Sequence, residues 1–212
     1  AAIEDRGYAA VNCGPIPTPA VANWAMGEGI ASLMVTGSHI PDDRNGIKFY
    51  RPVGEILKAD EAAIRARSVS LPGGRFTSDG VLLDPSLPVA SPVALRAYVR
   101  RYLDFFPPGC LTGRRIALYE HSTVAREALA QILAGLGAEV LPLGRADRFV
   151  PVDTEAVRPE DVALARRWAG EVGFDAIVSA DGDGDRPLVG DERGTWLRGD
   201  VAGILTARDL GA

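Results

Sequence analysis

The amino-acid sequence predicts an α/β fold made of mixed α/β sheet domains. Its 212 residues are 47% hydrophobic and 24% charged, which are the proportions of an ordinary globular protein. A turn signal at Asn45-Gly46 lies between two short apolar runs and indicates a hairpin in the first half. After Pro107, strand-like and helix-like segments alternate, which is typical of a doubly wound parallel sheet.

The first half begins with a proline-rich loop and continues into the hairpin. Three prolines within residues 15–19 exclude a regular helix there. Small and apolar residues predict a helix at 20–29, and the apolar run at 30–35 predicts a buried strand. A second strand at 47–50 pairs with the first across the Asn45-Gly46 turn, so residues 36–41 lie in the loop at the hairpin's tip.

Two helices and a long loop complete the first half. Residues 58–68 and 92–105 read as helices, and residues 70–91 between them read as loop because they are rich in proline, glycine and serine. The second helix has an apolar face formed by Leu95, Tyr98, Val99, Tyr102 and Leu103.

The second half shows a cleaner alternation of strands and helices. Strands are predicted at 115–119, 139–143 and 174–180, the last of them buried, and helices at 123–136 and 158–170. Gly137 stands where a glycine commonly ends a helix. Ser122 and Thr123 are interpreted as caps of the first of these helices rather than as catalytic residues.

Charge, apolar runs and cysteine content indicate which partners and which compartment to expect. The formal net charge is -5 and no basic stripe is present, which gives no support to nucleic-acid binding. No apolar run approaches the roughly 20 residues of a membrane span, so no membrane partner is expected. Cys13 and Cys110 are far apart, which favours two reduced thiols in a cytoplasmic protein. The first residues lack the apolar segment of a signal peptide.

The strongest local signal is the acidic loop Asp181–Arg186, which reads DGDGDR. In an extended loop alternate residues point the same way, so Asp181, Asp183 and Asp185 can converge on one cation. Carboxylate oxygens suit Mg²⁺ or Ca²⁺. Two alternatives remain open. One is a solvated acidic turn. The other is a calcium-binding EF-hand, with Glu192 at position twelve but Arg186 where that loop needs glycine.

A second loop, Thr36–Pro41, places Ser38 beside His39. Neighbours on an extended chain point in different directions, so His39 is not an obvious base for Ser38. The chain has no Gly-x-Ser-x-Gly elbow, which argues against a serine hydrolase. Taken alone, this pair indicates no more than an ordinary turn.

Taken together, the two loops resemble the signatures of the α-D-phosphohexomutase family. Thr36–Pro41 (TGSHIP), followed by Asn45–Lys48 (NGIK), is similar to that family's T-A-S-H-N-P…N-G-x-K segment. The acidic loop matches its D-G-D-G-D-R loop in the right order. The serine loop departs from the pattern in having Gly37 for alanine and Ile40 for asparagine, which leaves the serine in place.

The resemblance implies a role for each of these residues. Ser38 would carry a phosphoryl group, and an oxygen of phosphorylated Ser38 would bind Mg²⁺ together with Asp181, Asp183 and Asp185. His39 and Lys48 match the family's candidates for proton transfer at the sugar hydroxyl. Arg186 matches an arginine that lies near the phosphoserine.

The resemblance also implies the reaction, which is the interconversion of hexose 1-phosphate and hexose 6-phosphate. The best-matching members of the family act on mannose phosphates. Glucose and glucosamine phosphates are alternatives, and a calcium-binding module is a more distant one. The implied activator is glucose or mannose 1,6-bisphosphate, and the implied partner is a small sugar phosphate. The oligomeric state is not readable from the sequence.

The family's opening motif and its sugar-reading and distal phosphate loops are not found in this sequence. We therefore expect residues 1–106 to be an incomplete domain I that carries the serine loop. Residues 107–196 would be a doubly wound domain II that carries the metal loop, and residues 197–212 the start of domain III. We expect the 212-residue chain alone to be inactive.

Overall fold

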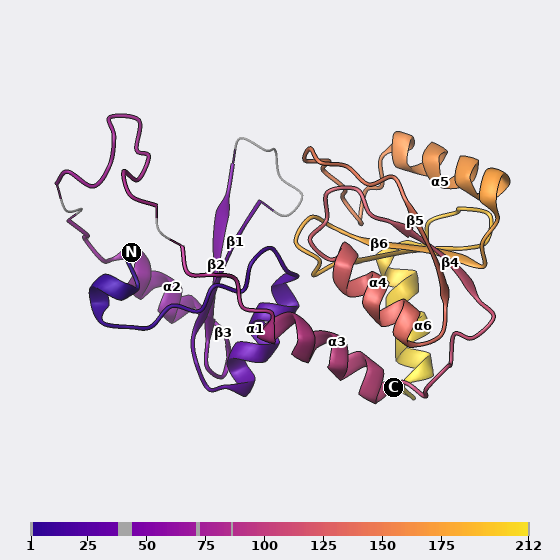
Figure 1. Cartoon of the computed structure of the whole chain (residues 1–212), viewed down its shortest axis with the longest axis horizontal. Helices are drawn as coiled ribbons and strands as arrows, with labels where there is room; N and C mark the ends of the chain where they lie inside the picture. The colour runs from indigo at the N-terminus through magenta and orange to yellow at the C-terminus, as the bar shows by residue number, and fades with distance from the viewer. Residues whose placement is uncertain (1, 38–43, 71–72, 86, 212) are drawn as a thin grey trace.

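A computed structural model describes residues 2–37, 44–70, 73–85 and 87–211. Within these ranges the chain forms two sheets, each with its own helices, and helix α3 runs between them (Figure 1). None of the helices in these ranges combines the length and the apolar character needed to cross a membrane.

The first half is built on a three-stranded antiparallel sheet in the order β1-β2-β3. A short 3₁₀ helix precedes it. Its elements are η1 (Glu4–Arg6), α1 (Thr18–Gly27), β1 (Ser32–Thr36), β2 (Gly46–Arg51), β3 (Gly54–Glu55), α2 (Lys58–Arg65) and α3 (Val93–Phe105). β1 and β2 pair from Ser32↔Tyr50 to Thr36↔Gly46, which confirms the predicted hairpin.

The prediction that the first strand is buried was wrong. Side chains alternate along β1, and Leu33 and Val35 are 44% and 63% exposed. Ile47, which pairs with Val35, is also exposed. One face of an antiparallel sheet can remain open to solvent, and an apolar run by itself does not distinguish such a strand from one covered on both faces.

The second half is the predicted doubly wound unit. Its elements are β4 (Arg115–Tyr119), α4 (Arg126–Gly135), β5 (Glu139–Leu143), α5 (Pro159–Val172), β6 (Ala176–Ala180), β7 (Pro187–Gly190) and α6 (Gly199–Asp209). The sheet order is β5-β4-β6-β7, with β4 parallel to β5 and β6, and with β7 antiparallel to β6. In Figure 1, α5 lies on one face of this sheet, and α4 and α6 lie on the other.

Burial of apolar side chains explains how each half holds together. The largest core cluster packs Trp168 of α5 against the sheet residues Ala117, Tyr119 and Ile177. A smaller cluster joins α1 to α3 through residues such as Val21 and Ala94.

A third cluster connects the two halves. Val99 of α3 packs against Ile132 of α4 and against Leu136, which follows it. Because α3 contacts α1 on one side and α4 on the other, it connects the hairpin half with the doubly wound half. Buried apolar side chains of this size each contribute about 1.5–3 kcal/mol relative to exposure.

Candidate metal centre

The acidic loop connects β6 to β7, beyond the carboxyl end of a strand that belongs to the parallel part of the sheet. The Asp181 carboxylate organises the loop, because its Oδ1 accepts hydrogen bonds from the backbone N–H groups of Asp185 and Arg186, both at 3.2 Å. The Asp181 N–H donates to the carbonyl of Arg186 at 3.1 Å, and Gly184 donates to the carbonyl of Asp181 at 3.2 Å. The loop is therefore closed by hydrogen bonds among its own residues, made by its backbone and by the Asp181 carboxylate.

Three carboxylates of this loop converge. One oxygen each from Asp181, Asp183 and Asp185 lies within 4.8 Å of the others. Asp181 and Asp183 are buried, at 0% and 2% exposure, whereas the Asp185 side chain is 31% exposed. Buried like charges repel one another unless cations offset them. An all-oxygen donor set of this kind fits a hard divalent cation, so the cluster could hold a metal ion.

This geometry removes both alternatives for the acidic loop. An EF-hand loop connects two helices, whereas residues 181–186 connect two antiparallel strands, β6 and β7. A solvated acidic turn would expose its carboxylates, whereas Asp181 and Asp183 are buried.

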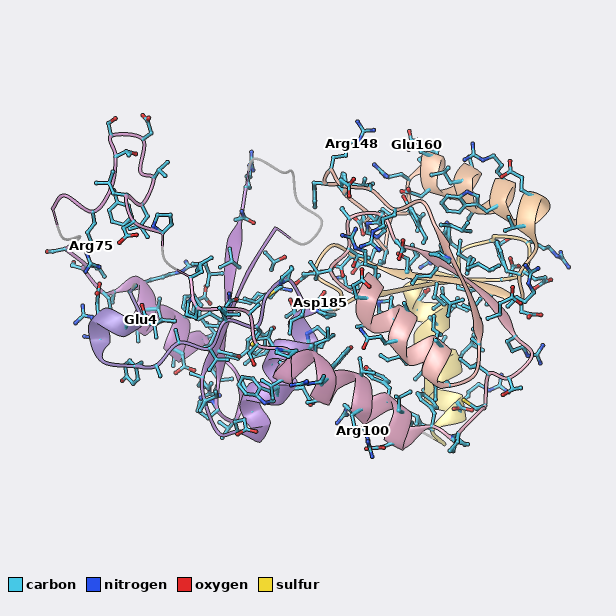
Figure 2. All side chains as sticks on the ribbon, in the orientation of Figure 1. Glu4, Arg75, Arg100, Arg148, Glu160 and Asp185 are labelled. Carbon is cyan, nitrogen blue, oxygen red and sulfur yellow. The ribbon has the colours of Figure 1, made fainter. Side chains whose placement is uncertain are left out.

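Lys48 of β2 reaches the cluster from the other half of the molecule. Its Nζ donates to Asp183 Oδ2 at 2.7 Å and to Asp185 Oδ2 at 2.5 Å. Burial alone would lower the pKa of Lys48, but the hydrogen bonds and charges of the two aspartates outweigh it and hold this pKa well above its usual value. Lys48 therefore stays a cation beside the carboxylates. Figure 2 shows Asp185 where the two halves meet.

Two threonines that sequence reasoning did not assign to the site also hold the loop. Thr18 Oγ1 donates to Asp183 Oδ2 at 2.6 Å, and Thr123 Oγ1 donates to the Asp181 carbonyl at 2.6 Å. Thr18 is the first residue of α1 and stands between Pro17 and Pro19, so the sequence shows it only as part of a proline-rich turn.

The interpretation of Ser122 and Thr123 as helix caps is correct only in part. The residue that precedes α4 is Ala125, and no side chain caps this helix. Ser122 exchanges hydrogen bonds with the backbone of Val150, and Thr123 binds the acidic loop. Thr123 Oγ1 also accepts a hydrogen bond from the N–H of Ala125 at 3.1 Å, so its hydroxyl group closes the turn immediately before α4.

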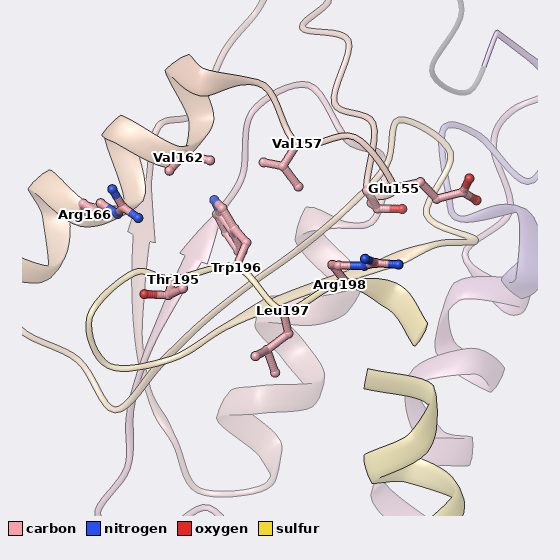
Figure 3. Close-up of a pocket in the computed structure, with 9 residues that line it drawn as sticks. Glu155, Val157, Val162, Arg166, Thr195, Trp196, Leu197 and Arg198 are labelled. Atoms are coloured by element: carbon pink, nitrogen blue, oxygen red, sulfur yellow. The ribbon is translucent and has the colours of Figure 1, made fainter. Parts of the chain in front are cut away.

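The guanidinium group of Arg186 forms an ion pair with Glu155. Its Nη1 lies 3.3 Å from Oε1 of Glu155, which precedes α5. Glu155 lines a cavity of about 250 Å³ together with Trp196 and Arg198. Figure 3 shows Glu155 and Arg198 on one side of this cavity and Arg166 on the other.

Ser38 and His39 lie outside the described residues. The strands that flank them are described, and Thr36 pairs with Gly46 where β1 and β2 approach the loop. Of the predicted site residues, the structure therefore brings together Lys48, Asp183 and Asp185, with Asp181 in the same cluster.

His121 supports the strand that leads into the acidic loop. The side chain is fully buried, and its Nε2–H donates to the carbonyl of Ala180 at 2.8 Å. Among the described residues its Nδ1 has no hydrogen-bond partner. Burial lowers the pKa of His121 below the ordinary value of 6.5, because a charged imidazole would lose its hydration.

We expect this histidine to make the fold sensitive to acid. The unfolded chain takes up a proton below about pH 6.5, whereas the folded chain does so only at lower pH, so the free energy of unfolding falls as pH drops through this window. Urea unfolding at pH 7 and pH 5 measures the loss in the wild type and in His121→Gln, which keeps an N–H donor. The wild type should lose more; equal losses would contradict the prediction.

Comparison with known proteins shows which proteins this chain resembles. Residues 1–70 match the family model described as phosphoglucomutase/phosphomannomutase, alpha/beta/alpha domain I. A phosphomannomutase of Salmonella muenchen is 46% identical over 100% of this chain and 42% of its own length. A phosphomannomutase of Sinorhizobium fredii is 49% identical over 100% of this chain and 44% of its own length. A phosphoglucosamine mutase of Magnetococcus marinus is 30% identical, covering 99% of this chain and 43% of its own length.

Solved structures agree in fold. A phosphoglucomutase/phosphomannomutase family protein from Burkholderia thailandensis superposes with a TM-score of 0.66 at 21% identity, over 94% of this chain and 44% of that one. The chain spans less than half the length of the curated relatives it matches. The domain I match covers residues 1–70, and the relatives align along the whole chain, so this chain is similar to proteins of the phosphoglucomutase/phosphomannomutase family along its length.

Proposed function

We propose that the protein to which this chain belongs is a phosphomannomutase, which interconverts mannose 1-phosphate and mannose 6-phosphate. The observation that carries the proposal is the convergence of three carboxylates with Lys48, a residue of the hairpin that holds the serine loop. Relatives named phosphomannomutase are 46% and 49% identical, against 30% for a phosphoglucosamine mutase, which favours mannose over glucosamine. Phosphoglucomutase activity is the remaining alternative.

In this proposal Ser38 carries the phosphoryl group, and Asp181, Asp183 and Asp185 hold Mg²⁺ together with an oxygen of phosphorylated Ser38. The three aspartates support this assignment because each offers a carboxylate oxygen, a ligand that suits a hard divalent cation. Bound Mg²⁺ would supply positive charge to offset that of the transferring phosphoryl group.

Charge explains why the hairpin lysine belongs to the site. Phosphorylated Ser38 would add about -1.5 to -2 charges near three carboxylates. Lys48 contributes a positive charge, because Asp183 and Asp185 raise its pKa more than burial lowers it. Phosphoryl transfer depends more on positioning and charge neutralisation than on covalent help from the protein.

The transfer itself has two halves. The bond from phosphorus to Ser38 Oγ breaks as a bond to a sugar hydroxyl oxygen forms, and the proton of that hydroxyl passes to a nearby base. The resulting hexose 1,6-bisphosphate reorients, and its other phosphoryl group returns to Ser38. His39 and Lys48 are the proposed proton-transfer groups, and Lys48 is protonated where it contacts Asp183 and Asp185. Arg186 is proposed to lie near the phosphoserine, and glucose or mannose 1,6-bisphosphate is the proposed activator.

We also propose the division of the chain into domain I at 1–106, domain II at 107–196 and the start of domain III at 197–212. The doubly wound sheet with β4 to β7 lies within the second of these ranges, which supports the division. A cytoplasmic location is supported by Cys13 and Cys110, which are both free thiols.

The identity of the phosphorylated residue tests the proposed function. The whole protein is incubated with glucose 1,6-bisphosphate and Mg²⁺, and peptide mass spectrometry should find one phosphoryl group on the peptide that contains Ser38. Ser38→Ala should remove it. The matched control is Ser68→Ala, in an exposed position after α2, which should keep the label.

Phosphorylation at another residue would contradict the proposed function, as would calorimetry showing a strong preference for Ca²⁺ over Mg²⁺ with no phosphoserine. Within the family, relative rates of the whole protein on mannose, glucose and glucosamine phosphates separate the three sugar specificities.

A further inference from the structure

Thr18 holds Asp183 at two points. The Thr18 N–H donates to the Asp183 carbonyl at 2.8 Å, and its Oγ1 donates to Asp183 Oδ2 at 2.6 Å. Thr18 is 2% exposed, and the two residues are 165 positions apart in the chain. Backbone and side chain of one residue thus fix both the position of Asp183 and the orientation of its carboxylate.

Thr18 is held rigidly enough to act this way. It stands between Pro17 and Pro19, whose rings fix their own backbone φ angles. Pro17 also lies against the acidic loop, since a Cβ atom built at Gly184 would lie 3.1 Å from Pro17 Cβ. The hydroxyl group is not a helix cap, because the position before α1 is occupied by Pro17 and no side chain caps this helix.

The hydroxyl group of Thr18 restrains the Asp183 carboxylate without adding charge, which Lys48 cannot do. Both donors contact the same oxygen, Asp183 Oδ2, at 2.6 Å and 2.7 Å. The Lys48 ammonium partly cancels the charge of the carboxylate, and this weakens the attraction of the carboxylate for a cation. The neutral hydroxyl of Thr18 restrains the carboxylate and leaves its charge intact. Hydrogen-bond partners of this kind orient metal ligands, and their loss typically weakens metal binding about 10–100-fold.

We propose that Thr18 is the positioning residue that orients Asp183 for the divalent cation, and that it couples the proline-rich segment before α1 to the metal loop. This inference rests on the proposed function, because it takes Asp183 as a metal ligand. It adds a residue that neither loop motif contains.

Calorimetric titration of the 212-residue chain with Mg²⁺ and Mn²⁺ tests the proposal through Thr18→Val and Thr18→Ser. Valine has nearly the shape of threonine but no hydroxyl, so T18V should bind either ion at least about 10-fold more weakly. Serine keeps the hydroxyl, so T18S should stay within about threefold of the wild type. The matched control is Thr206→Val on the exposed face of α6, where Oγ1 donates only to the Ala202 carbonyl, and it should bind like the wild type.

The outcomes separate this proposal from the proposed function. Wild-type affinity in a folded T18V, checked by circular dichroism, overturns the role of Thr18 and leaves the metal site standing. Equal losses in T18S and T18V also overturn it, because they would point to packing of the methyl group. If T18V does not fold, T18S decides, since the proposal requires it to keep its affinity. Absence of metal binding by the wild type overturns the metal site and this proposal together.

Discussion

Replacing Asp183 with asparagine is expected to weaken Mg²⁺ binding by more than about 100-fold. This exceeds the loss of about 10–100-fold that typically follows removal of a hydrogen-bond partner of a metal ligand. Asp183 is buried and lies in the convergent carboxylate cluster. Asparagine keeps the size of the side chain but removes its charge, and a neutral amide is a poor substitute among ligands for a hard cation. Calorimetry on the purified chain measures the effect.

A surface aspartate provides the control for this substitution. Asp104 of α3 pairs with Arg100 at 2.7 Å, and its side chain is 59% exposed. Asp104→Asn should leave Mg²⁺ affinity unchanged, because an exposed ion pair of this kind contributes little and lies outside the cluster. Equal affinities in D183N and D104N would show that the cluster is not a metal site.

The second large effect is expected for Gly184→Ala, which should destabilise the fold by about 2–4 kcal/mol. Gly184 has φ +73°, a left-handed conformation that side chains with a Cβ rarely adopt. An added Cβ would also lie 2.9 Å from Ala125 Cβ and 3.1 Å from Pro17 Cβ, so the acidic loop would have to move away from both residues. Chemical denaturation followed by circular dichroism measures the change in the free energy of unfolding.

Gly203 is the matched glycine for this experiment. It lies in α6 at an exposed position, and an added Cβ would meet nothing within 4 Å. Gly203→Ala should therefore stabilise the protein by about 0.5–1 kcal/mol through helix propensity. A Gly184→Ala variant as stable as the wild type would contradict the close packing of the acidic loop.

Features encoded by neighbouring residues were predictable from the sequence. The strands 115–119 and 139–143 were predicted with the bounds that the structure gives them, because each is a short run ended by turn residues. The convergence of Asp181, Asp183 and Asp185 followed from their alternate spacing. The hairpin of β1 and β2 followed from Asn45-Gly46.

Features that depend on distant contacts were not predictable. The exposure of Val35 depends on what covers its face of the sheet, which periodicity does not report. Thr18 joins the metal loop through a residue 165 positions away, and Arg186 turns towards Glu155 rather than towards its sequence neighbours. A single sequence carries no signal for such pairs, because each partner alone resembles an ordinary turn or surface residue.

The carboxylate cluster in one half receives hydrogen bonds from the other half, and this has a consequence for transplanting the site. Residues 107–196 contain all three carboxylates, but Thr18 and Lys48 come from the other half. The doubly wound unit moved alone into another scaffold would keep the acidic motif and lose the donors that hold Asp183. The acidic motif therefore needs contacts from the other half to keep its geometry. By thermodynamic linkage, any ion that binds the assembled site more tightly also stabilises the association of the two halves.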